Sequence, residues 1–350
     1  MRPSHSTEHR GPALLVPQTS FLGDVVLTTP LLSALRERLA PRRLAVLVRP
    51  DAAPLLRGHP AVDDVLVDDK RGADGGLAGL WRVAQRLRRE GFDLAVCPHR
   101  SLRTALLLAL AGVPRRIGFD ASRGWFLFHE RVYRDPGRHD VARNLALMDA
   151  VGGWSGTPCL HVPVAEDAAA RAAALLDGHG GRPLAVLAPG SVWHTKRWTA
   201  AGFAALARGL GARGVFCVLV GPPSDVARSR RIAAAAGANV LDLTGRTDLA
   251  TLTAVIDRGQ VLVGNDSAPM HLATARGVPV VAVFCATTPA LGYGPYGAAT
   301  RVVQVDLACR PCGRHGGRHC PRGTEDCRHL VRPGAVLEAT LALLDARAGG

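Results

Sequence analysis

Lysine is almost absent from this sequence of 350 residues. Of its 43 basic residues only Lys70 and Lys196 are lysines, and the others are arginines. Replacement on this scale suggests codon bias more than function. It also makes Lys196 informative, because a chain that uses arginine nearly everywhere has kept a compact ammonium group in a predicted loop.

Long apolar segments are also missing. Residues 1–12 are polar and lack the apolar core of a secretory signal, so we expect a flexible leader there. The longest uncharged run, residues 277–300, contains Pro279, Pro289 and Pro295 and cannot form a continuous membrane helix. We therefore expect a soluble, cytoplasmic protein.

Aromatic residues are scarce, at 5%, and no nucleic-acid-binding module is recognisable, so nucleic acid is not an expected partner despite a net charge of +14. The basic excess is concentrated in residues 82–123, which hold nine arginines against three acidic residues. A solvated helix face explains much of this excess. The functional alternative is a surface for a phosphosugar or a phosphorylated lipid, with peripheral contact to an anionic membrane.

The sequence also has no D-x-D segment. A divalent ion on a diphosphate is therefore not required, and we expect no cofactor.

The length of the chain favours two domains of about 150 residues each. In both halves continuous apolar strands alternate with helical patterns, which is typical of a parallel sheet covered on both faces. The sequence thus predicts an α/β fold with two Rossmann-like domains, residues 13–164 and 165–332, followed by a final helix in residues 333–350. The first domain's strands are expected at 13–16, 44–48, 65–67, 94–97 and 116–119, and the second's at 184–188, 215–220, 240–241, 261–263 and 278–284. Helices are expected at 25–38, 77–89, 102–110 and 138–152 in the first domain, and at 166–176, 199–213, 225–236, 249–257 and 268–275 in the second.

One glycine motif is excluded as a nucleotide site. Residues 209–214 match G-x-G-x-x-G, but they follow a predicted helix and precede a predicted strand, which is the reverse of a dinucleotide-binding context. We interpret them as the glycine-rich end of a helix.

Four loops that follow predicted strands carry candidate functional residues. Gly23 and Asp24 stand where a loop meets a helix, so Asp24 is either a helix cap or a site carboxylate. Backbone amides, Thr195 and Lys196 offer hydrogen-bond donors to a diphosphate in residues 189–198. Asp225 is either a ribose ligand or a cap, and Asp266 or Ser267 is expected to cap the helix that contains His271.

Three segments carry a resemblance to a known family: QTSFLGDVVLTTPLL at 18–32, PGSVWHTKRW at 189–198 and GNDSAPMH at 264–271. Together they resemble the bacterial heptosyltransferases of glycosyltransferase family 9. The resemblance implies the two-domain GT-B architecture, with an interdomain cleft and a final helix that crosses back to the first domain. It makes residues 13–164 the acceptor domain and residues 165–332 the nucleotide-sugar domain.

The resemblance also implies roles for individual residues. Asp24 would be the general base on the acceptor hydroxyl, and Lys196 would offset charge on the leaving group. The substrate-binding positions that it implies, some of them by weak analogy, are Gly23, Ser191, Thr195, Asp225, Leu249, Asp266, Ser267, Ala268 and His271. Pro269 stands where the family often has Leu or Thr, a change that a first helical turn tolerates.

The implied reaction is an inverting, metal-independent transfer of heptose from ADP-heptose to the lipopolysaccharide inner core, with the heptosyltransferase II type nearest. The acceptor would be a lipid-linked anionic glycan. Two alternatives are a family member that uses another nucleotide sugar and glycan acceptor, and a non-catalytic nucleotide-sugar or nucleic-acid binding protein with a cysteine metal module.

Four cysteines near the C-terminus stay open between a structural metal site, free thiols and redox disulfides. Cys309, Cys312, Cys320 and Cys327 include one C-x-x-C pair, but the remaining spacing is looser than that of a paired zinc ribbon. The other cysteines fall in predicted strands or connectors and are expected to be small core residues.

Overall fold

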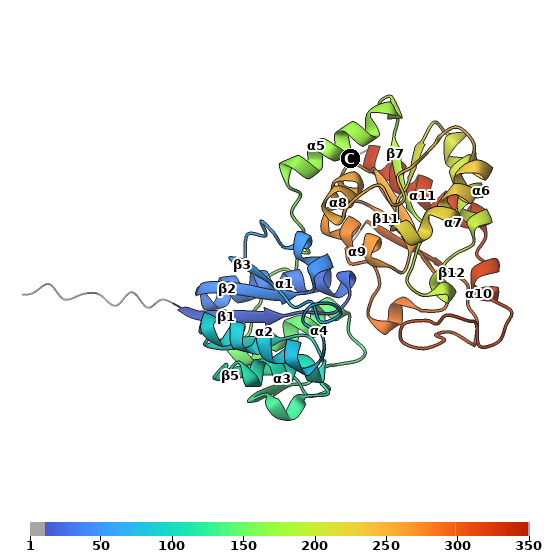
Figure 1. The fold of residues 1–350 in the computed structure, drawn as a ribbon. Coiled ribbons are helices and arrows are strands. Elements are labelled where there is room, and N and C mark those ends of the chain that lie inside the picture. The colour runs from blue at the N-terminus through green and yellow to red at the C-terminus, as the bar shows by residue number, and fades with distance from the viewer. Residues whose placement is uncertain (1–10, 298, 349–350) are drawn as a thin grey trace, which may run out of the picture. The chain divides into compact units, whose positions relative to one another are not determined.

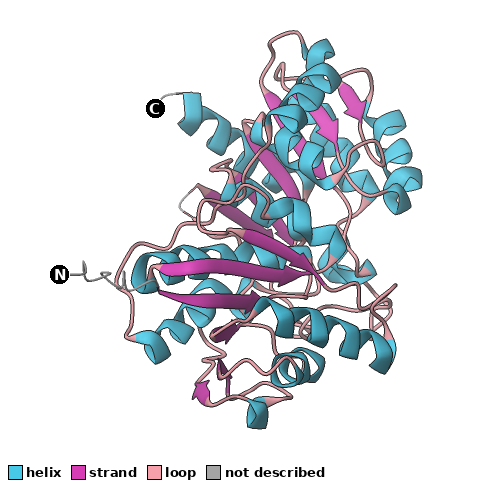
Figure 2. Ribbon diagram, turned by 60° about the vertical axis from the view of Figure 1, so that its left-hand side comes forward, coloured by secondary structure: helices cyan, strands magenta, loops and turns pink. Residues whose placement is uncertain are grey.

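The computed structural model describes residues 11–297 and 299–348. Contacts within the chain divide it into two compact units, Met1–Cys159 and Leu160–Gly350, five residues before the expected domain boundary. Most of the expected leader lies outside the described residues, but Gly11 and Pro12 already belong to the first strand. Each unit is an α/β layer structure whose parallel strands form one twisted sheet between helices (Figures 1 and 2).

The first unit contains a six-stranded sheet in the order β3-β2-β1-β4-β5-β6. All its strand pairs are parallel. The strands are β1 (Gly11–Pro17), β2 (Pro41–Val48), β3 (Asp64–Val67), β4 (Leu94–Cys97), β5 (Arg115–Phe119) and β6 (Glu130–Val132). The α-helices are α1 (Leu22–Leu39), α2 (Gly76–Glu90), α3 (Leu102–Leu110) and α4 (Asp140–Leu145), and the short 3₁₀ segments η1 (Pro50–Leu55), η2 (Trp125–Leu127) and η3 (Ala146–Val151) complete the unit.

Both faces of the first sheet are covered, as continuous apolar strands require. Ala13 and Leu15 of β1 belong to a core cluster with residues of α2 and α3. The alternate residues Leu14 and Val16 are equally buried and point to the opposite face, where α1 contacts β1 and β2. The helix expected at 138–152 is interrupted, because its second half, η3, has 3₁₀ geometry.

The second unit repeats this plan with the sheet order β12-β11-β10-β7-β8-β9. Its strands are β7 (Leu184–Ala188), β8 (Phe216–Leu219), β9 (Val240–Asp242), β10 (Val261–Asn265), β11 (Val280–Phe284) and β12 (Thr300–Gln304). Its α-helices are α5 (Glu166–Leu176), α6 (Ala200–Gly211), α7 (Val226–Ala236), α8 (Leu249–Asp257), α9 (Ala268–Ala275), α10 (Asp326–His329) and α11 (Pro333–Ala348). Its 3₁₀ segments are η4 (Asp177–His179), η5 (His194–Lys196), η6 (Pro223–Asp225) and η7 (Pro289–Leu291).

The final helix packs on the second unit. Helix α11 contacts α6 and strands β10, β11 and β12, and Val336 and Leu343 are buried in that unit's core. The expected return of this helix to the first domain stays a prediction. Residues 209–214 form the glycine-rich end of a helix, as the sequence predicts, because they contain the end of α6 and precede β8.

None of the helices in the described part of the chain combines the length and the apolarity that crossing a bilayer requires.

Candidate functional site

The strand order of each sheet fixes where ligands are expected to bind. In the first sheet the chain runs outward from β1 in one direction and from β4 in the other, and in the second sheet it does so from β7 and β10. Ligands of open parallel sheets bind beyond the carboxyl ends of the strands at such reversal points. The segments after β1 and β4, and after β7 and β10, are therefore the places to examine.

Asp24 lies beyond β1, in the first turn of α1. Its Oδ2 accepts hydrogen bonds from Ser20 Oγ at 2.5 Å and from the Phe21 amide at 3.2 Å, so the carboxylate does cap the helix. Burial raises the pKa of Asp24 above the ordinary aspartate value, and the Ser20 hydrogen bond opposes part of that rise. A capping role and a proton-accepting role are thus compatible, because a carboxylate with a raised pKa is a stronger base.

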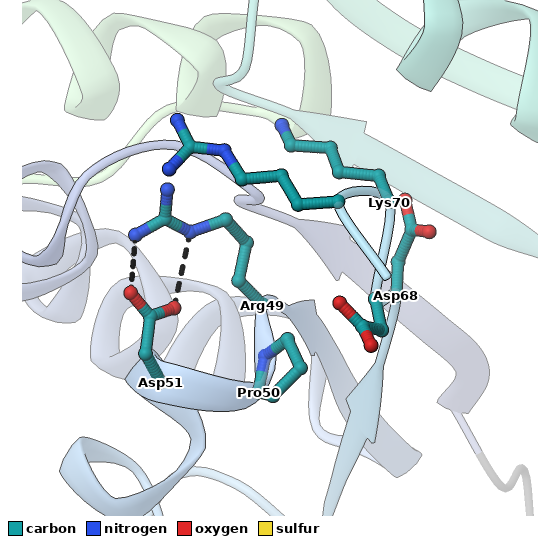
Figure 3. Close-up of a pocket in the computed structure, with 7 residues that line it drawn as sticks. Arg49, Pro50, Asp51, Asp68 and Lys70 are labelled. Carbon is teal, nitrogen blue, oxygen red and sulfur yellow. Dashed lines mark hydrogen bonds and ion pairs between the residues drawn. The ribbon is translucent and has the colours of Figure 1, made fainter. Parts of the chain in front are cut away.

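A pocket lined by charged side chains of both signs lies beside this helix at the same edge of the sheet. A cavity of about 220 Å³ is lined by residues that follow β2 and β3, among them Arg49, Asp51, Asp68 and Lys70 (Figure 3). Arg49 bonds both carboxylate oxygens of Asp51, at 3.1 and 2.5 Å. Lys70 Nζ donates to the carbonyl oxygen of Thr19, after β1, at 2.5 Å. The segments after two neighbouring strands, β2 and β3, therefore line this pocket, and Lys70 joins it to the segment after β1.

Burial and neighbouring charges shift the pKa values of two groups at this pocket, Lys70 and His99. Burial lowers the pKa of Lys70, the Asp68 carboxylate opposes part of that shift, and the cations Arg49, Arg71 and Arg103 lower the pKa further. Burial and the same positive surroundings, with Lys70 the largest electrostatic contributor, lower the pKa of His99 to about 3. His99 is therefore neutral at physiological pH. The lining holds three cations against three carboxylates, Asp51, Asp68 and Asp69, and two of these are paired with arginines, Asp51 with Arg49 and Asp68 with Arg103.

In the second unit the reversal point holds a nearly buried ion pair. Lys196 Nζ lies 2.6 Å from Asp266 Oδ2, with side-chain exposures of 13% and 7%. Thr287, which follows β11, donates its hydroxyl to the same carboxylate oxygen at 2.6 Å. The structure thus brings together two residues that the sequence analysis selected from segments seventy residues apart.

Asn265, the last residue of β10, fixes the loop that carries Lys196. Its Oδ1 accepts the Trp198 amide at 2.8 Å, and its Nδ2 donates to the carbonyl oxygens of Pro189 at 2.9 Å and Gly190 at 3.2 Å. Asn265 is fully buried. Both ends of the 189–198 loop are therefore attached to the strand that precedes Asp266.

The cysteine-containing segment supports the same loop from the other side. Gly317 donates its amide to Thr195 Oγ1 at 2.8 Å, and the Thr195 amide donates to the Gly317 carbonyl at 3.1 Å. A Cβ at neighbouring Gly316 would lie 2.9 Å from Lys196 Cγ. Thr195 is therefore nearly buried, and its hydroxyl is engaged within the protein.

Asp225 faces the loop and does not cap its helix through its side chain. A Cβ at Gly190 would lie 2.0 Å from Asp225 Oδ2, so glycine is required for this approach. The Asp225 side chain makes no cap hydrogen bond to α7. Burial raises the pKa of this carboxyl, while Arg197 and Arg228 nearby oppose the rise. This geometry favours a ligand role for Asp225 over the capping alternative.

The remaining candidates occupy the expected elements without joining the ion pair. Ser191 accepts the Arg197 side chain with its carbonyl oxygen at 2.6 Å. Ser267 is the cap position of α9 but makes no side-chain cap hydrogen bond, and Asp266 is engaged with Lys196 instead. Ser267 therefore holds the predicted cap position of α9 without the side-chain hydrogen bond of a cap. In the first turn, which begins at Ala268, Pro269 has no amide, and Met270 donates its amide to the Ser267 carbonyl at 3.1 Å. His271 is buried within α9, and Leu249 begins α8.

The four C-terminal cysteines gather but do not form a metal centre within the described residues. They are free thiols, and burial raises the pKa of Cys312 and Cys327, with the neighbouring thiols adding to the rise. Across residues 11–297 and 299–348, no group of three or more His, Cys, Asp or Glu side chains could hold a metal ion. The thiol arrangement therefore does not fit a bound metal, and no chemical step is assigned to one.

Sequence reasoning missed Lys70, Asn265 and Thr287. The rarity of lysine could have pointed to Lys70, since it is one of only two lysines in the sequence. Asn265 stood directly before the selected Asp266, but its role depends on contacts to residues 189, 190 and 198.

Comparison with known proteins places this geometry in a family. Residues 80–319 match the model of glycosyltransferase family 9 (heptosyltransferase). The chain is 28% identical over 331 residues to lipopolysaccharide heptosyltransferase 1 of Pseudomonas aeruginosa, covering 91% of this chain and 90% of the relative.

Solved structures agree with the fold. A family 9 glycosyltransferase from Veillonella parvula superposes with a TM-score of 0.86 at 26% identity, covering 97% and 99% of the two chains. The ADP-heptose lipopolysaccharide heptosyltransferase II of Escherichia coli superposes with a TM-score of 0.80 at 24% identity, covering 96% and 99%. The expected GT-B class of two Rossmann-like units is confirmed, and the chain belongs to glycosyltransferase family 9, the heptosyltransferases, and is a glycosyltransferase.

Proposed function

We propose that this protein transfers a heptose from ADP-heptose to the inner core of lipopolysaccharide, with inversion at the anomeric carbon. The observation that carries the proposal is the Lys196–Asp266 pair at the reversal point of the second sheet, beside the start of α9. A lysine ammonium and the N-terminal end of a helix are suited to a diphosphate. The names of the relatives support heptose as the sugar and lipopolysaccharide as the acceptor.

The reaction is a single displacement. The Asp24 carboxylate takes the proton of the acceptor hydroxyl while its oxygen forms a bond to the anomeric carbon. The bond from that carbon to the diphosphate oxygen breaks, and ADP leaves with the electron pair. Lys196 offsets the negative charge that develops on the leaving oxygen, and Asp225 is placed to bind the ribose hydroxyls.

Replacement of Asp24 tests this mechanism. Asp24→Asn keeps the size of the side chain and removes the base, so transfer should fall by about 100-fold or more, while ADP binding stays unchanged. Asp149→Asn, at an exposed position of the same unit, is the control. A purified variant that retains more than about a tenth of the wild-type rate would contradict the role of Asp24.

The donor sugar is tested separately. Released nucleotide is measured with ADP-heptose and with a set of other nucleotide sugars, each with the same acceptor. The proposal expects ADP-heptose to be the preferred donor, and preference for another sugar nucleotide would instead support the alternative family member.

The proposal requires no divalent ion, because Lys196 and the helix amides supply the positive charge. We expect chelation with EDTA to leave the transfer rate unchanged. Loss of the rate on chelation, with recovery on adding Mg²⁺ or Mn²⁺, would overturn this part. Elemental analysis of the purified protein tests the cysteine segment for metal.

We infer that the pocket around Lys70 binds an anionic group of the lipid-linked acceptor at the cytoplasmic face of the membrane. The support is the Lys70 and Arg71 side chains in its lining, at the same edge of the first sheet as Asp24, where Asp51 and Asp68 are already paired with Arg49 and Arg103. Lys70→Met should raise the KM for the acceptor about tenfold with little change in the KM for the donor, as expected for loss of a charge-assisted hydrogen bond. Lys70→Arg should recover part of the loss, and an unchanged acceptor KM in Lys70→Met would reject the assignment.

A further inference from the structure

Exposed apolar side chains are concentrated on one part of the first unit. Eleven large apolar side chains are exposed in the described residues, and six of them lie on α2, α3 and η2. Trp81, Trp125 and Phe126 are 54%, 47% and 59% exposed. The six residues of this α2–α3–η2 face are Leu77, Trp81, Leu102, Leu110, Trp125 and Phe126.

The three elements of this face adjoin one another. Helix α2 packs against α3, and α3 packs against η2. A Cβ at Gly124, next to Trp125, would lie 2.4 Å from Ala105 Cβ and 3.4 Å from Leu102 Cδ1, so η2 sits directly on α3. The rings of Trp125 and Phe126 meet edge to face with centroids 6.0 Å apart. Figure 1 shows α2 and α3 side by side against the first sheet.

Positive charge surrounds the same face. Arg131 lies over the Trp125 ring, 5.2 Å from its centroid. The acidic residue of α2, Glu90, is paired with Arg43 of β2 and does not offset these charges. The exposed arginines on α2 and around η2 are Arg82, Arg86, Arg88, Arg89, Arg123 and Arg131.

We propose that the α2–α3–η2 face docks on an anionic lipid bilayer, with the tryptophan rings at the headgroup level and the arginines on lipid phosphates. Exposed indole rings bordered by several arginines match the two components of such a surface, an apolar boundary and anionic headgroups. The inference goes beyond the proposed function, because it concerns a docking surface and not the transfer site.

Vesicle flotation with the full chain tests the proposal. Wild-type protein should float with vesicles of phosphatidylcholine mixed with phosphatidylglycerol, and not with phosphatidylcholine alone, and high salt should weaken the binding. The double variant Trp81→Ser/Trp125→Ser should bind the vesicles at least about tenfold more weakly, because it loses two apolar side chains that the proposal places in the bilayer. Leu330→Ser is the control, since Leu330 of the second unit is 54% exposed, as is Trp81.

The outcomes separate this proposal from the transfer reaction. The double variant should unfold at the wild-type temperature and should transfer sugar to a delipidated, water-soluble acceptor at the wild-type rate. Vesicle binding that survives in the double variant, or that is absent from the wild type, overturns the proposal. A change from dimer to monomer in the variant, without vesicle binding by the wild type, would assign the face to subunit contact instead. Failure of transfer with every donor would overturn the proposed function and leave the flotation result standing.

Discussion

At the scale of single residues, Asp24 combines a catalytic expectation with a cost in stability. Its folded-state pKa is raised, so the folded state binds the proton more tightly than the unfolded state does. Stability therefore falls as the pH rises from the unfolded-state pKa through the folded-state pKa.

Asp24→Asn should consequently unfold at the same or a higher temperature than wild type at pH 7, although its transfer activity is lost. The difference should shrink as the pH is lowered toward the ordinary aspartate pKa of 3.8, because the native carboxyl is already protonated before that pH is reached. Thermal melts at the two pH values check this. A variant that is clearly less stable at pH 7 would show that Asp24 acts mainly as a helix cap.

The Lys196–Asp266 pair gives a second prediction at this scale. Lys196→Met leaves a nearly buried carboxylate without its cation and should cost about 3 kcal/mol in the free energy of unfolding. The double variant Lys196→Met/Asp266→Asn should recover much of that stability while remaining inactive. Urea denaturation of the wild type, Lys196→Met, Asp266→Asn and the double variant measures the coupling between the two side chains. A double variant no more stable than Lys196→Met would contradict this prediction.

At the scale of elements, the 189–198 loop owes its position to Asn265. Asn265→Ala removes three hydrogen bonds that hold both ends of the loop, so the KM for the donor should rise about tenfold or more. Gln260→Ala, at the other end of β10, loses one hydrogen bond to the Leu184 amide and is the control. Steady-state kinetics of the two variants measures the donor KM. An unchanged donor KM in Asn265→Ala would show that the loop holds its position without this residue.

Elements with a continuous apolar run or a strong helical period were predictable from the sequence. Strand β7 and helices α3, α5, α8 and α9 have the predicted bounds. Strands β6 and β12 were missed, because they are short edge strands with partly exposed residues and have no buried apolar run to mark them.

The site was predictable only in part, and for a related reason. Asp24, Lys196 and Asp266 stand in recognisable segments, so their sequence neighbours identify them. The contacts of Thr195 with Gly317 and of Lys70 with Thr19 join residues 122 and 51 positions apart. Local patterns contain no information on such pairs, which depend on the packing of the whole unit.

At the scale of the whole molecule, each unit has a hydrophobic core of its own. We therefore expect two transitions in calorimetric unfolding. Saturating ADP, at about 100 times its dissociation constant, should stabilise the second unit by about 2.7 kcal/mol and raise only one transition, by roughly 5–10 °C.

The Lys196→Met variant supplies the control for this calorimetric experiment, because its ADP-dependent shift should be smaller. Equal shifts of both transitions on adding ADP would contradict the assignment of nucleotide binding to the second unit alone.

The presence of one lysine in each unit has a practical consequence. Apart from the terminal amine, an acylating reagent finds only Lys70 and Lys196 as side-chain amines. The lowered pKa of Lys70 increases its neutral fraction and hence its reactivity, whereas Lys196 is shielded by its carboxylate partner. Peptide mass spectrometry after brief acylation would therefore report nucleotide occupancy at one amine and acceptor occupancy at the other, in the same sample.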